Sequence, residues 1–166
     1  MALPDDAGPL AEVDRILARL EDPLLRGVAL YWRGKLRKDR LPGQRDIDPV
    51  EIPDFLSHLY LIDVERAPLR FRHRLIGTQI TEWAGRDATG TYVDEIDYGP
   101  HRETMIAEYS DVAARGLPRC DDLEARWPNP DYKYYTRILF PLASDGRSVD
   151  MLFCALNVHP RGHPDG

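Results

Sequence analysis

The amino-acid sequence predicts an α+β domain in which two strands precede a group of helices and three strands follow it. Residues 69–76 (LRFRHRLI) alternate strictly, with arginines on one face and Leu, Phe and His on the other, which is the period of a strand. Residues 99–116 instead repeat apolar side chains at helical spacing. Three strand-like runs follow, the last two joined by Asp145-Gly146, a strong hairpin signal.

Two amphipathic helices are expected at the N-terminus. Leucine, valine and isoleucine recur at helical spacing over residues 10–20, and a second such series follows Pro23 as far as Leu36. The basic run RGKLRKDR at 33–40 suits the negative end of a helix dipole. Because charge runs usually face water, we interpret this run as a solvated helix end rather than a partner-binding patch.

A short helix and a hairpin are expected next. Asp48 is a suitable N-cap and Pro49 a suitable first helical residue, whereas Pro53 lacks an amide donor and limits the helix to one or two turns. Residues 58–65 have the apolar density of a strand and form a hairpin with residues 69–76.

The three later strands are expected at 117–127, 132–142 and 148–158. The last of them is apolar at nearly every position rather than at every second one. Both of its faces must therefore be covered. One face is expected to contact the core of the domain, and the other to contact either the N-terminal helices or a second subunit.

Composition and charge exclude several classes of protein. The 166 residues, 43% hydrophobic and 30% charged, fit one globular domain, and no apolar run approaches the roughly 20 residues that cross a membrane. A net charge of −6 argues against nucleic acid as a partner. The two cysteines, Cys120 and Cys154, are expected to be reduced thiols, and the N-terminus lacks a signal-peptide pattern, so a cytoplasmic location is expected.

This order of elements resembles the PAS domain family, a five-stranded antiparallel sheet with helices across one face that serves in sensing and docking. RLIGTQITEWAGRDATGTYVDEI at 74–96 is similar to a bacterial single-domain PAS subgroup long catalogued as a domain of unknown function, and WRGKLRKDRLPGQRDIDP resembles the segment that precedes its sheet. We accordingly divide the chain into an N-terminal helical extension (1–40), a PAS-like sensory domain (41–160) and a disordered tail (161–166).

The resemblance implies a pocket between the concave face of the sheet and the helices. His73 and Trp83 are the first candidates for ligand binding because each adds a polar group to an apolar wall. Arg74 is a candidate for an anionic group, although the strand alternation directs it to the opposite face. The other expected lining residues are Tyr60, Phe71, Leu75, Tyr109, Phe140 and Phe153. Aromatic residues at such positions also suit an ordinary core.

The sequence does not identify a cofactor. A photoactive flavin relative would carry a reactive cysteine where this chain has GRDATG, so covalent flavin photochemistry is excluded. A haem relative would need an axial histidine, and His101 lies in the first turn of its helix, where exposure is expected. His58 and His73 have no carboxylate or thiolate companions for a metal site.

The leading hypothesis is a regulatory, non-enzymatic PAS sensor or adaptor that binds a small molecule, a protein partner or both. Partner binding or homodimerisation is expected through the N-terminal helices and the outer face of the sheet. One alternative is a small α+β enzyme that acts on an apolar metabolite in a conical pocket, with His73 or a nearby carboxylate as base. Another is a structural interaction module with a filled core and no ligand.

Overall fold

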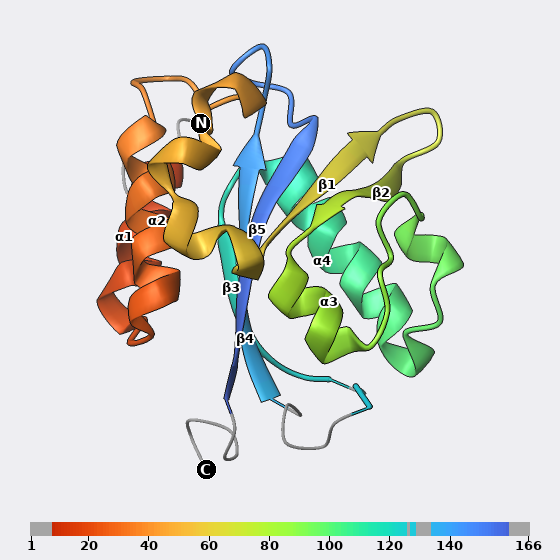
Figure 1. Cartoon of the computed structure of the whole chain (residues 1–166). Coiled ribbons are helices and arrows are strands. Elements are labelled where there is room, and N and C mark those ends of the chain that lie inside the picture. The colour runs from red at the N-terminus through yellow and green to blue at the C-terminus, as the bar shows by residue number, and fades with distance from the viewer. Residues whose placement is uncertain (1–7, 126, 129–133, 160–166) are drawn as a thin grey trace.

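The computed structural model describes residues 8–125, 127–128 and 134–159 (Figure 1). The α-helices are α1 (Pro9–Arg19), α2 (Pro23–Lys35), α3 (Thr78–Ala84) and α4 (Arg102–Arg115). The strands are β1 (Leu59–Glu65), β2 (Arg70–Ile76), β3 (Arg119–Glu124), β4 (Tyr134–Leu142) and β5 (Met151–His159). Short 3-10 helices occupy Gln44–Asp46, Pro49–Glu51, Pro53–His58, Val93–Glu95 and Gly99–His101. The predicted tail lies outside the described residues.

The five strands form one sheet in the order β2-β1-β5-β4-β3, and each neighbouring pair is antiparallel. The predicted α+β class and five-stranded antiparallel sheet are therefore confirmed. The apolar strand β5 is central in this order, with β1 on one side and β4 on the other. Its position explains why nearly all of its residues are apolar, since both of its faces are covered.

The helix starts expected at Pro23 and at Asp48-Pro49 are present. Asp22 caps α2 by accepting a hydrogen bond from the Leu25 amide at 3.0 Å. The expected short helix after Asp48 is present, but it consists of two 3-10 segments, the second beginning at Pro53. The expected helix at 99–116 begins as a 3-10 turn and continues as α4, which ends at Gly116 in the left-handed conformation (φ 64°).

The helices cover both faces of the sheet. Figure 1 shows α1 and α2 on one side of it and α3 and α4 on the other. On the α1/α2 side, Trp32 of α2 is fully buried and stacks on Phe140 at 5.1 Å between ring centroids. Phe140 in turn packs against Phe153 of β5 at 6.0 Å. The second face of β5, for which the sequence left two alternatives, is thus covered by the N-terminal helices of the same chain.

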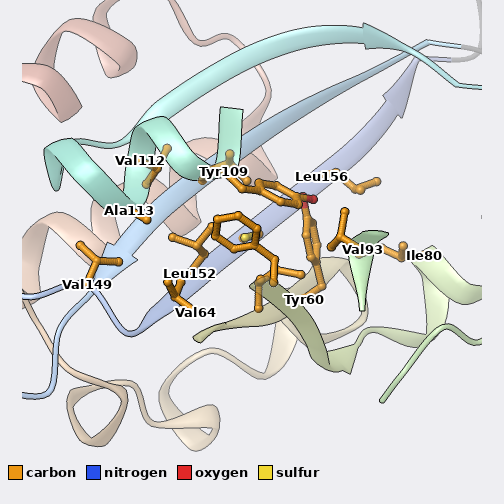
Figure 2. Close-up of a cluster of buried hydrophobic side chains, with 14 of the residues drawn as sticks. Tyr60, Val64, Ile80, Val93, Tyr109, Val112, Ala113, Val149, Leu152 and Leu156 are labelled. Carbon is orange, nitrogen blue, oxygen red and sulfur yellow. The ribbon is translucent and has the colours of Figure 1, made fainter. Parts of the chain in front are cut away.

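The opposite face forms a second core with α3 and α4, drawn in Figure 2. Tyr60 and Val64 of β1 and Leu152 of β5 pack there beneath Tyr109 and Val112 of α4. This core is not filled along its whole length, because a cavity opens between the sheet, α3 and α4. None of the helices in the described ranges is both long and apolar enough to span a membrane.

Candidate functional site

The candidate site is a cavity of about 710 Å³ between the sheet and the helices. This volume falls within the roughly 300–1,000 Å³ typical of small-molecule sites. Its walls come from all five strands of the sheet, from α3 and α4, and from the segments that precede α4 and follow β3. The aromatic side chains among the lining residues are Tyr60, Tyr98, Tyr109, Trp127 and Tyr135, together with His73 and His101.

His73 is the best-defined polar group of this cavity. Strand alternation turns it inward, and its side chain is 5% exposed. Its Nε2 lies 3.1 Å from the Tyr98 hydroxyl, whereas its Nδ1 has no hydrogen-bond partner among the described residues. Burial, with a contribution from the nearby Arg86 charge, lowers the pKa of His73 to about 4. The imidazole is therefore neutral at pH 7.

The tyrosines of the cavity wall are also neutral at pH 7. Burial raises the pKa of Tyr98 to about 12 and raises the pKa of Tyr60 and Tyr109 well above the usual value. The Tyr60 and Tyr109 hydroxyls are hydrogen-bonded to each other, and Figure 2 shows these two side chains pointing toward one another from β1 and α4. They supply neutral hydrogen-bonding groups in a largely aromatic wall.

A buried arginine also lines the cavity. Arg137 of β4 is 1% exposed, and its Nη2 donates hydrogen bonds to the carboxylates of Glu108 and, at 3.0 Å, Asp121. Its guanidinium also lies 5.5 Å from the centre of the Tyr109 ring. Two carboxylates thus offset one buried positive charge, as a buried ion requires. The Arg137 Nε has no hydrogen-bond partner within the described part of the chain.

Three of the predicted ligand-binding residues line the cavity and two lie close behind its wall. Tyr60, His73 and Tyr109 line it directly. Phe71 is buried beside it, with its ring edge on Tyr109 at 5.6 Å. Trp83 is buried in α3 and stacks on the lining residue Trp127 at 6.3 Å. Ligand binding by these residues stays a prediction.

The four other candidate residues lie elsewhere. Phe140 and Phe153 occupy the α1/α2 face of the sheet, because they are paired across β4 and β5 and so share a face with each other and with Trp32. Leu75 is half exposed. Arg74 is on the surface, as its place in the alternation indicated, with its Nη1 3.5 Å from an Asp63 carboxylate oxygen.

Several lining residues were missed by the sequence reasoning, and one of them carries a detectable signal. Arg137 is the only charged residue in the strand YYTRILFPL. A charge within such a strand indicates a buried ion with a partner. Tyr98 and Trp127 lie in the connecting segments, where no periodicity indicates which way a side chain points.

The histidines considered for cofactor binding are separated. His101 lies at the cavity but is exposed, and His58 contacts the Leu156 carbonyl oxygen and the edge of Trp83. His159 is the last residue of β5, and its Nε2 lies 2.6 Å from the Thr136 hydroxyl. No group of three or more His, Cys, Asp or Glu residues suited to a metal ion occurs in the ranges that the structure describes.

Comparisons with known proteins agree with this architecture. The family model of the PAS domain matches residues 21–157. Among solved structures, the PAS domain of BvgS from Bordetella pertussis aligns with a TM-score of 0.51 and 15% identity over 68% of this chain and 83% of that one. A search of curated proteins gives no match.

Two further solved structures are similar at lower TM-scores. The N-terminal domain of a diguanylate cyclase with PAS/PAC sensor from Marinobacter aquaeolei aligns at 15% identity and TM-score 0.46, covering 60% of this chain and 94% of that one. A fungal LOV domain photoreceptor aligns at 11% identity and TM-score 0.49, covering 81% and 91%. The family model of the PAS domain matches more than half of the sequence, and the chain therefore belongs to the PAS domain family.

Proposed function

We propose that this PAS domain is a regulatory sensor that binds a small molecule in the cavity between the sheet and α3/α4. The observation that supports this proposal is the cavity of about 710 Å³ between the sheet and the helices, whose lining combines aromatic rings and neutral polar groups with several charged residues. A few placed polar groups in an apolar wall are the usual composition of a small-molecule site.

The proposed ligand is held by stacking and by neutral hydrogen bonds. Trp127 and Tyr135 stack on each other at 5.0 Å and offer an aromatic wall. His73 and Tyr98 contribute the polar end, since both are uncharged at pH 7. Occupancy would stabilise the domain, because a ligand that binds only the folded state adds its binding free energy to folding.

Native mass spectrometry of the protein purified without refolding tests this proposal. We expect a stoichiometric mass excess in the wild type that disappears on denaturation. Ala84→Trp, which adds a large side chain from α3 into the cavity, should abolish the excess. Leu30→Trp is the matched control, because Leu30 is 52% exposed on α2. A wild type without excess mass, or an excess retained by Ala84→Trp, would count against the proposal and favour the ligand-free interaction module.

The non-enzymatic role belongs to the same proposal. A histidine whose pKa is about 4 is a weak base at neutral pH, which disfavours the alternative of catalysis by His73. Consumption of the recovered ligand by the wild type, but not by His73→Ala, would instead establish the enzyme alternative.

The regulatory signal is proposed to pass from the domain to a protein partner or a second copy through the N-terminal helices. Because α1 and α2 cover the outer face of the sheet, a protein partner or a second copy would meet their outward sides rather than the sheet itself. Leu10 and Leu30 are each about half exposed there. A cytoplasmic location is part of the proposal, and the two cysteines, which are unpaired, suit a reducing compartment.

A further inference from the structure

A second, smaller hollow lies outside the PAS cavity and gathers basic side chains. Its volume is about 190 Å³, and it is bounded by the end of α2, the loop at 37–46 and the β4–β5 turn. Four cationic residues line it, namely Lys35, Arg37, Arg40 and Arg45, against one carboxylate, Asp46. The hollow is thus locally positive, whereas the whole chain carries a net charge of −6.

Most of the positive charge in this hollow has no internal counter-ion. Lys35 is paired with Glu51 at 3.0 Å, and the Asp46 carboxylate accepts a hydrogen bond from the Gly43 amide at 2.8 Å. No ion pair to Arg37, Arg40 or Arg45 exists among the described residues. One cation in the last turn of α2 suffices to complement a helix dipole of about half a charge, so the three arginines exceed what that role requires.

The backbone of the loop brings Arg37 and Arg40 together beside the β4–β5 turn. Residues 37–40 form a tight turn, in which the Arg40 amide donates to the Arg37 carbonyl at 3.1 Å. The loop is attached to the β4–β5 turn by the Leu41 amide, which donates to Gly146 at 2.8 Å, and by the Pro42 carbonyl, which accepts from Ala143 at 2.9 Å. The Arg40 side chain lies directly against Gly146, where a Cβ would be 2.7 Å from Nε.

We propose that this hollow is a binding site for a phosphate-type oxyanion. Guanidinium groups match the geometry of phosphate oxygens and form strong charge-assisted hydrogen bonds with them. A volume of about 190 Å³ is several times the roughly 30 Å³ that one water occupies, which leaves room for a phosphate group with its hydration. The bound anion neutralises like charges that otherwise repel one another, and it ties the end of α2 to the sheet.

Isothermal titration calorimetry with inorganic phosphate tests the proposal, with ionic strength held constant by sodium chloride. We expect saturable binding by the wild type, and a dissociation constant raised about tenfold or more by Arg37→Gln or Arg45→Gln, since a hydrogen bond to a charged group is worth about 1.5–3 kcal/mol. Lys38→Gln is the matched control, because Lys38 belongs to the same turn but does not line the hollow.

Thermal unfolding adds a second readout that does not depend on heat of binding. Phosphate also stabilises proteins generally by exclusion from their surface, so the wild-type increase in Tm must exceed that of Arg37→Gln, while Lys38→Gln must match the wild type.

Phenyl phosphate in place of inorganic phosphate distinguishes the two possible sources of the bound phosphate. Tighter binding of phenyl phosphate shows that the phosphate belongs to an organic molecule, and equal or weaker binding shows that the ligand is the free ion. Equal responses of all three variants, or no saturable binding, would overturn the proposal.

Discussion

Protonation of His73 is expected to destabilise the domain in mildly acidic solution. Its pKa is lowered from 6.5 to about 4 by burial and by the Arg86 charge. The unfolded chain therefore binds more protons than the folded one between these two values, and stability falls as the pH falls through this window. The stabilisation of the folded state by neutral His73 is fully present above pH 6.5. Its complete loss below pH 4 amounts to about 3.4 kcal/mol, at 1.36 kcal/mol per pKa unit.

The expected loss at pH 5.0, relative to pH 7.5, is about 2 kcal/mol from His73 alone, because the unfolded imidazole is then almost fully protonated and the folded one is not. The side chain is only 5% exposed, so solvent screening does not reduce this figure much. A protonated ring would also have both nitrogens as donors, and no acceptor for Nδ1 occurs among the described residues.

Urea unfolding at pH 7.5 and 5.0 measures this effect. Between pH 7.5 and pH 5.0, the free energy of unfolding of the wild type should fall by about 2 kcal/mol more than that of His73→Gln, since the variant has no group to titrate at this position. His101→Gln is the control, because His101 is exposed and its removal should leave the wild-type difference intact. If His73→Gln retained the full pH dependence of the wild type, burial of a neutral imidazole would not be its source.

Three further predictions concern the fold. Trp32→Ala should lower the free energy of unfolding by about 3–5 kcal/mol in urea titrations, because a fully buried indole and its hydrogen bond to β4 are lost; a loss below 1 kcal/mol would contradict this packing. Removal of residues 1–22 should expose the α1/α2 core and cause aggregation detectable by light scattering, and an unchanged mass and stability would refute it. Gly77→Ala should destabilise by about 1–3 kcal/mol in chemical unfolding, because its Cβ would lie 2.3 Å from the Ser57 carbonyl oxygen, whereas Gly34→Ala, with no atom within 4 Å, should not.

The strands and helices could be predicted because their signals are local. The alternation in residues 70–76 predicts the strand and the face that His73 shares with Phe71, although Leu75, which the same period places on that face, is half exposed. The start of α2 at Pro23 and the Asp48 cap of the 3-10 helix at Pro49–Glu51 likewise depend only on neighbouring residues. These parts of the structure need no information from distant segments.

The positions of Phe140 and Phe153 required information that their strands do not contain. In β4 and β5 apolar residues occupy both faces, so the apolar pattern alone does not identify the cavity side. The register between β1 and β5 identifies the cavity side. Tyr60 pairs with Cys154, so these two residues share the cavity face and Phe153 lies on the other face. Register between strands almost a hundred residues apart cannot be read from either one alone.

Arg137 shows why the chemistry of the cavity was harder to predict than its location. The strand supplies the arginine, but the carboxylate of Glu108 comes from α4 and that of Asp121 from β3. With two carboxylates bound to it, Arg137 contributes no unbalanced positive charge that would attract an anionic ligand. We therefore expect ligand selection in the cavity to depend on the neutral His73, on the surrounding rings and on Arg86, the other arginine of the lining. The basic hollow beside α2 differs in gathering three arginines that have no ion pair among the described residues, so exchanging phosphate for chloride should affect binding there more than binding in the cavity.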